Sequence, residues 1–159
     1  MSKTTLGKQF EDRFAKNWRS CFPNTFLFRL KDQMSGYKVT SQNPCDYLAY
    51  VNKQLWMLEC KETKENTFNF AKLTQYEDML SYSGLEGVNP YVIIWFSSHD
   101  KVIAVRIEEI KRLKDLNFKS INIKMLKNSL YNIVVIPSVK KRTFMDSDYT
   151  VIPSIMEVK

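Results

Sequence analysis

The chain of 159 residues is long enough for a domain that buries a hydrophobic core without disulfides or a structural metal. Hydrophobic residues make up 44% of it and aromatic residues 13%, which argues against an intrinsically disordered protein. Its 24 Lys and Arg residues exceed its 17 Asp and Glu residues, and the net charge of +7 favours a polyanionic partner such as nucleic acid. A globular protein with many surface lysines would carry the same charge.

Several classes of protein are disfavoured by what the sequence lacks. No apolar run approaches the roughly 18 residues of a membrane-spanning helix, and the first residues lack the apolar segment of a signal peptide. The three cysteines have no CxxC spacing, which indicates reduced thiols in a cytoplasmic protein. The single histidine, His99, excludes a paired-histidine metal site and a Ser–His–Asp triad. Any hydrolysis would therefore depend on carboxylates, lysine and a bound metal.

The first part of the chain predicts a helix, a strand and a hairpin. Four large apolar residues recur at four-residue spacing and predict an amphipathic helix over about residues 4–20: Leu6, Phe10, Phe14 and Trp18. "TFLFRL" (25–30) predicts a short strand, and the polar residues 31–43 predict a loop or projecting excursion. "CDYLAYV" and "QLWMLECKE" predict two strands joined by a tight turn at Asn52 and Lys53.

The second part of the chain alternates between helix and strand patterns. Residues 64–70 are predicted to be a connection, and residues 73–83 a helix closed by Gly84. "YVIIWFS" is typical of a strand covered on both faces, "KVIAVRI" predicts another strand, and a lysine-rich helix follows over residues 107–116. "YNIVVIPS" predicts a late strand, before an extended tail from Lys140. The order α-β-β-β-α-β-β-α-β predicts an α/β fold with a mixed sheet flanked by helices.

Three charged residues lie within or beside the two hairpin strands: Asp46, Glu59 and Lys61. Charged side chains are rarely buried unless they are paired or bind a metal. Because side chains alternate along a strand, Glu59 and Lys61 share one face. In an antiparallel pair the start of one strand adjoins the end of the next, so we expect the three groups to converge at one edge of the sheet.

Two carboxylates in this arrangement suit Mg²⁺ or Mn²⁺, which prefer hard oxygen ligands. A lysine two residues beyond a ligand could stabilise charge on a phosphate. An E-x-K triplet on an exposed strand is by itself more often a cross-strand ion pair. The addition of Asp46, the basic charge and the lack of other catalytic groups favour a metal-dependent nuclease.

Asp46 together with Glu59-Cys60-Lys61 resembles the signature of the PD-(D/E)XK nuclease superfamily. The stretch "LECKETKENTFNFAKLTQYEDML" (58–80) resembles the RecU-type Holliday junction resolvases of Gram-positive bacteria and their phages. "GKQFEDRF" is similar to the opening helix of that family, and "YVIIWFS" to one of its later strands. The resemblance implies a restriction-endonuclease-like core, with residues 1–159 forming a single nuclease domain and a short projecting loop near residues 31–43.

The resemblance also implies roles for individual residues. Asp46 and Glu59 match the metal-binding carboxylates of the family, and Lys61 matches the lysine that stabilises the transition state. Gln75 falls where the family has a glutamine that contributes to the metal site, and Glu11 matches a catalytic glutamate of the opening helix. A helix-surface amide and a solvated carboxylate are the alternative interpretations of these last two residues.

Two features depart from the family pattern. Pro44 stands where the family has a threonine of the metal site, so only its backbone carbonyl could serve there. The stalk of the family, between the first two strands, is reduced here to residues 31–43. This shortening affects the expected geometry of the DNA substrate more than the expected cleavage of a phosphodiester.

The sequence therefore predicts an endonuclease dependent on Mg²⁺ (or Mn²⁺) that resolves four-way DNA junctions as a homodimer, in recombination, repair or phage DNA processing. A restriction-type endonuclease that cuts duplex DNA and a non-catalytic DNA-binding protein on the same fold are the alternatives. Five basic residues are predicted to contact phosphates, with a solvated surface charge as the alternative for each: Arg29, Lys31, Lys38, Lys64 and Lys72.

Overall fold

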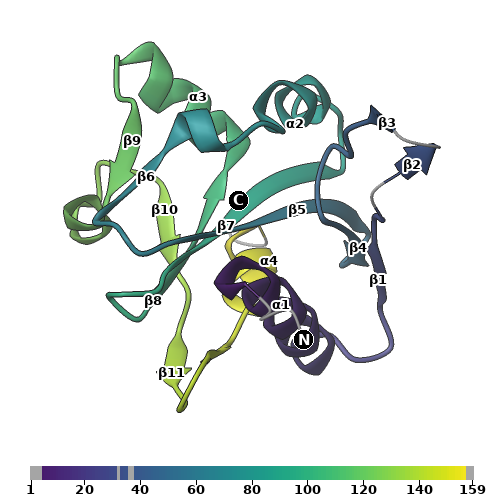
Figure 1. The fold of residues 1–159 in the computed structure, drawn as a ribbon, viewed down its shortest axis with the longest axis horizontal. Helices are drawn as coiled ribbons and strands as arrows, with labels where there is room; N and C mark the ends of the chain where they lie inside the picture. The colour runs from purple at the N-terminus through teal and green to yellow at the C-terminus, as the bar shows by residue number, and fades with distance from the viewer. Residues whose placement is uncertain (1–4, 32, 36–37, 157–159) are drawn as a thin grey trace.

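A six-stranded sheet forms the centre of the computed structural model, which describes residues 5–31, 33–35 and 38–156, and the side chains of residues 5–31 and 42–153. The strand order is β1-β4-β5-β7-β8-β10 (Figure 1). These strands are β1 (Phe26–Arg29), β4 (Tyr47–Val51), β5 (Gln54–Thr63), β7 (Val88–Phe96), β8 (Lys101–Arg106) and β10 (Ile133–Val135). Only β5 and β7 pair in parallel in this sheet, so the predicted mixed α/β fold is confirmed.

Helix α1 (Leu6–Cys21) covers one face of the sheet. The Thr5 side chain begins the helix by accepting a hydrogen bond of 3.2 Å from the Lys8 backbone N–H, a common N-cap arrangement. The apolar stripe predicted from four-residue spacing is buried against the residues of β4 and β5 that point to this side, among them Trp56 and Leu58. This packing fixes α1, and with it Glu11, over the central strands.

The opposite face of the sheet is covered by α2 (Tyr76–Tyr82) and α3 (Ile107–Asp115). The second core lies between these helices and the apolar residues of β7 and β8, which explains why "YVIIWFS" reads as a strand buried on both faces. Among the described residues, no helix is long and apolar enough to cross a membrane.

The turn between β4 and β5 sets the register of the strands that carry the predicted site. Asn52 and Lys53 have φ of 54° and 61°, which is the left-handed conformation that a two-residue hairpin turn requires. In the resulting ladder Tyr47 faces Leu58. Asp46, the residue before Tyr47, and Glu59, the residue after Leu58, therefore come side by side.

Several short elements were not predicted. Residues 64–70 contain β6 (Thr67–Asn69), which pairs with β9 (Ser120–Asn122), and the 3-10 helices η1 (Phe70–Lys72) and η2 (Ile123–Lys127) follow these two strands. The predicted loop 31–43 contains the hairpin of β2 (Gln33–Ser35) and β3 (Lys38–Ser41). The tail forms a second hairpin of β11 (Ser138–Lys140) and β12 (Met145–Ser147), and then α4 (Val151–Met156). Three-residue strands are too short to show an alternating pattern in the sequence.

The helix predicted over residues 73–83 begins later than expected. Leu73 and Thr74 precede it, Gln75 is its N-cap residue, and α2 starts at Tyr76. Leu73 fits the helical spacing because its side chain is buried in the same core as that of Met79 on α2. Its backbone, however, ends the preceding 3-10 helix.

Candidate active site

Asp46 lies immediately before β4, where its backbone joins three strands. Its N–H donates to the Leu58 carbonyl at 3.1 Å, and its carbonyl accepts from the Leu30 N–H at 2.9 Å. Its carboxylate accepts a hydrogen bond of 2.8 Å from the backbone N–H of Cys60. A backbone donor of β5 thus fixes the orientation of the Asp46 carboxylate next to Glu59.

Glu59 is a buried carboxylate with an unsatisfied oxygen. Its residue is 1% exposed, and its Oε2 has no hydrogen-bond partner among the residues that the structure describes. Burial and then the facing Asp46 carboxylate raise the pKa of Glu59 to about 10, and the positive charge of Lys61 opposes this shift. A buried anion of this kind is costly unless a cation or donor compensates it.

This pair of carboxylates fits a divalent cation with oxygen ligands. A cation between Asp46 and Glu59 would use the free Oε2 and would remove the repulsion that raises the pKa of Glu59. In the described part of the chain, however, no three His, Cys, Asp or Glu side chains gather closely enough to hold a metal ion by themselves. Asp46 and Glu59 could supply two ligands, which would suit an ion such as Mg²⁺ that keeps several waters.

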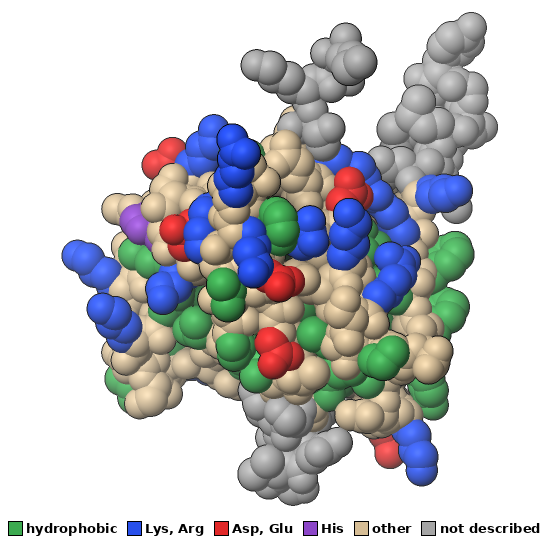
Figure 2. Space-filling view, turned by 90° about the horizontal axis from the view of Figure 1, so that it is seen from below, with side chains coloured by type: hydrophobic (Ala, Val, Ile, Leu, Met, Phe, Trp, Pro, Cys, Tyr) green, Lys and Arg blue, Asp and Glu red, His purple; other side chains and the backbone are tan. Residues whose placement is uncertain are grey.

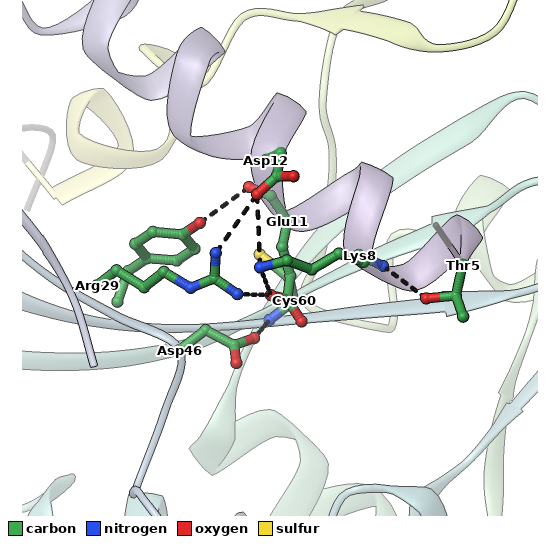
Figure 3. A network of polar contacts seen from close by, with 8 residues as sticks. Thr5, Lys8, Glu11, Asp12, Arg29, Asp46 and Cys60 are labelled. Atoms are coloured by element: carbon green, nitrogen blue, oxygen red, sulfur yellow. Dashed lines mark hydrogen bonds and ion pairs between the residues drawn. The ribbon is translucent and has the colours of Figure 1, made fainter. Parts of the chain in front are cut away.

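Glu11 reaches the same region from α1 and takes part in a network of ion pairs (Figure 3). Arg29 Nη2 lies 2.7 Å from Glu11 Oε2, and Arg29 Nη1 lies 3.4 Å from Asp12 Oδ1. Lys8 Nζ lies 3.7 Å from Glu11 and 3.6 Å from Asp12. Burial and the Asp46 carboxylate raise the pKa of Glu11, while Arg29 and Lys8 lower it. Glu11 is therefore within the electrostatic field of the Asp46 carboxylate.

An open cavity of about 590 Å³ gives solvent access to these groups. Its lining combines the carboxylates of Glu11 and Asp46 with three cationic side chains, those of Lys8, Arg29 and Lys31. A larger cavity of about 740 Å³ lies between the end of α1 and the β11–β12 hairpin, but it shares no lining residue with the first and contains no Lys or Arg. The cavity beside Asp46 therefore suits a phosphate better.

A family model described as "RecU: Recombination protein U" matches residues 29–142. The chain belongs to the RecU family. The matched region of this RecU-family chain contains Asp46, Glu59, Lys61 and Gln75, whereas Glu11 lies outside it. No curated protein matches the chain in sequence.

The fold of this RecU-family protein is similar to a solved nuclease structure. Hjc from Archaeoglobus fulgidus, described as a Holliday junction resolvase from an archaeal hyperthermophile, superposes with a TM-score of 0.51 and 20% identity, over 79% of this chain and 91% of that chain. At this level of identity the similarity concerns the fold. It supports the restriction-endonuclease-like core that the sequence predicts.

In this RecU-family chain, the two remaining predicted site residues, Lys61 and Gln75, differ in how they relate to the carboxylates of Asp46 and Glu59. Lys61 is half-buried on β5, and its charge affects the pKa of Glu59, so it lies within electrostatic reach of that carboxylate. Gln75 accepts a hydrogen bond of 3.2 Å from the Thr74 hydroxyl, and the contacts of the described residues do not join it to Asp46 or Glu59. The structure thus brings Lys61 to the carboxylates without doing so for Gln75.

Of the residues predicted to contact phosphates, some line the cavity beside Asp46 and others do not. Arg29 and Lys31 line the cavity beside Asp46, while Lys64 and Lys72 are exposed and do not line it. Lys38 belongs to β3, and its side chain lies outside the described residues. Lys8 was not identified from the sequence, although its spacing of three and four residues from Glu11 and Asp12 on a helix was a signal that could have found it.

Proposed function

We propose that this RecU-family protein is a structure-selective endonuclease that resolves Holliday junctions with the aid of Mg²⁺, or Mn²⁺ in its place. The observation that carries the proposal is the buried Glu59 carboxylate, which has an unsatisfied Oε2 and interacts with the Asp46 carboxylate, in a protein of resolvase family and fold. Lys and Arg side chains gather across the upper part of the face seen in Figure 2, which supports a polyanionic partner.

Asp46 and Glu59 would hold the ion, and Cys60 would keep the Asp46 carboxylate oriented through its backbone N–H. A bound divalent cation lowers the pKa of a water and offsets negative charge on the phosphate. Hydrolysis forms a bond from the water oxygen to phosphorus as the bond from phosphorus to the leaving oxygen breaks. Lys61 would stabilise the charge that develops, and Arg29 and Lys31 would bind the DNA phosphates that enter the cavity.

Resolution of a junction requires two cuts at symmetrically related positions, which a two-fold homodimer provides. The exposed aromatic surface on β1 and β4 supports such a dimer. Phe26, Phe28 and Tyr50 are 53%, 51% and 52% exposed, and the rings of Phe26 and Phe28 stack at 6.2 Å. Because β1 is the edge strand of the sheet (Figure 1), a second copy of the chain could cover these rings.

The proposed activity is tested by cleavage of a labelled synthetic four-way junction. Wild type is expected to nick the junction symmetrically in Mg²⁺, and Asp46→Asn is expected to lose at least roughly 100-fold in rate, as removal of a charge-stabilising catalytic group typically does. Asp78→Asn, a change of the same kind on the exposed surface of α2, is the matched control and should cleave normally.

Two further arms separate the alternatives. Equal cutting of a linear duplex would indicate a restriction-type nuclease, and binding without cutting in both Mg²⁺ and Mn²⁺ would indicate a non-catalytic DNA-binding protein. Loss of cleavage in EDTA is expected because the two carboxylates need the cation to act on the phosphate.

A further inference from the structure

Arg29 pairs with two carboxylates of the protein itself. Its two terminal nitrogens face different acids, with Nη2 2.7 Å from Glu11 and Nη1 3.4 Å from Asp12 (Figure 3). The side chain is nevertheless 38% exposed and lines the cavity beside Asp46. A phosphate that enters this cavity therefore meets a guanidinium group whose terminal N–H donors are directed at protein carboxylates.

Arginine pairs with carboxylates and phosphates through the same planar set of donors. A DNA phosphate can take a bidentate pair with both terminal nitrogens of Arg29 only when the carboxylates that now face those nitrogens give up their contacts. Glu11 is the partner with the shorter contact, and its side chain, 22% exposed, is the less hydrated of the two. Lys8 lies 3.7 Å from Glu11 and can retain part of the compensation when Arg29 leaves.

Glu11 lines the same cavity as Asp46. Its own negative charge acts on Glu59, and the charge of Asp46 acts on Glu11. Arg29 currently offsets part of this repulsion. Once Arg29 is withdrawn, the negative charge of Glu11 beside Asp46 is no longer offset by the guanidinium, so the cavity attracts a divalent cation more strongly than the network in Figure 3 does.

We propose that Arg29 exchanges Glu11 for a DNA phosphate when DNA binds, and that the freed Glu11 carboxylate strengthens the binding of the divalent cation. This inference rests on the proposed function, because it assumes that DNA and a cation bind in this cavity. The exchange makes the binding of DNA and of the cation cooperative. By linkage, each ligand increases the affinity of the protein for the other by the same factor.

The exchange is tested by junction affinity in EDTA, where neither metal binding nor cleavage contributes. Glu11→Gln removes the partner that Arg29 must leave, so the variant is expected to bind a fluorescent four-way junction roughly threefold to tenfold more tightly than wild type. In an Arg29→Ala background, Glu11→Gln should give no such gain. Glu65→Gln is the matched control, since no ion pair among the described residues joins Glu65 to a Lys or Arg, and its affinity should change little.

Removal of a negative charge near DNA can tighten binding without any exchange, and the double-variant comparison detects this. A gain of equal size in the Arg29→Ala background, or no gain in either, would overturn the exchange. If Arg29→Ala does not fold, Arg29→Gln serves in the same comparison because it keeps a polar side chain without the charge. A wild-type protein that binds no junction would instead contradict the proposed function.

The cation side of the proposal has its own readout. Calorimetric titration of Mn²⁺ into DNA-free protein should give a severalfold lower Kd for Arg29→Ala than for wild type, because the competing guanidinium is gone. Lys111→Ala, which breaks the 2.6 Å ion pair with Asp115 on α3, is the control and should match wild type. An unchanged or weaker Mn²⁺ affinity of Arg29→Ala would overturn the coupling.

Discussion

Glu59 shows how a site residue can oppose the stability of the protein that contains it. The carboxylate is buried beside Asp46, and the positive charge of Lys61 favours its charged form. A core position would ordinarily be filled by an apolar side chain or a neutral amide. The retention of a charged group there is understandable if the cation that compensates it is part of the working protein.

Glu59→Gln is therefore expected to stabilise the metal-free protein while abolishing cleavage. The pKa of Glu59 is raised to about 10 in the folded protein from an ordinary value of 4.5, so its contribution to stability is fully present below about pH 4.5 and is lost as the pH rises toward 10. At pH 8 in EDTA, the Tm of the variant should exceed that of wild type by about 3–6 °C, equivalent to roughly 1–2 kcal/mol. The difference should shrink at pH 5.

Thermal melts at the two pH values, with Glu77→Gln as an exposed control on α2, measure this effect. Addition of Mg²⁺ should raise the Tm of wild type and leave that of Glu59→Gln nearly unchanged, since binding to the folded state alone stabilises it. A variant that melts below wild type at pH 8 would show that the Glu59 carboxyl group has a compensating partner in the metal-free protein.

The β4–β5 hairpin is the element that brings the two carboxylates together, and its turn contains a correctable strain. Lys53 has φ of 61°, a conformation that costs a side chain with a Cβ atom and costs glycine nothing. Lys53→Gly would make an Asn-Gly turn, which suits this hairpin type best. Urea unfolding should show a gain of about 0.5–1 kcal/mol.

Cleavage by Lys53→Gly should equal that of wild type, because the turn lies at the opposite end of the hairpin from Asp46. Lys101→Gly, in the first position of β8, is the comparison in which glycine should weaken the fold. A destabilised Lys53→Gly protein would mean that the Lys53 side chain makes a contribution larger than the strain it relieves.

The elements that could be predicted from sequence are those whose pattern repeats several times. The α1 stripe recurs over four turns, and β5 and β7 are long apolar runs, so their types and approximate bounds followed from periodicity. The turn at Asn52 and Lys53 was identifiable by its length and its asparagine. Short strands such as β6 and β9 depend on each other across a long stretch of chain, and no local pattern encodes that pairing.

The same limit applies to the site. The adjacency of Asp46 and Glu59 follows from hairpin register, which local sequence determines. The position of Glu11 depends on how α1 packs across the sheet, and only the family resemblance indicated it. The ion pairs of Arg29 with Glu11 and Asp12 join a strand to a helix, so a basic residue predicted to contact phosphates proved to have protein partners as well.

At the scale of the whole molecule, the aromatic surface on β1 and β4 predicts the oligomeric state. Phe26→Ser combined with Phe28→Ser should convert a dimer into a monomer, because it removes the two stacked rings from the edge strand. Light scattering coupled to size-exclusion chromatography measures the mass directly. The monomer should still bind a junction but should lose paired nicking.

Val139→Ser is the matched control, since Val139 is an apolar residue 61% exposed on β11, away from the edge strand β1. It should leave the mass unchanged. A double variant that retains the mass of the wild-type dimer would show that the copies meet through another surface.

The Asn17 side chain joins α1 to β12, which has consequences for the order of assembly. Its amide donates to Asp146 Oδ1 at 2.6 Å and accepts from the Ser147 N–H at 3.2 Å, contacts that span 129 and 130 residues. Ribosomes add about 5–20 residues per second, and these bonds cannot form before β12 has been synthesised. The helix that carries Glu11 is made before β12, yet it gains these anchors only after β12 has been synthesised. A truncated product that ends before β12 would carry the carboxylates of the hairpin without a fully anchored α1.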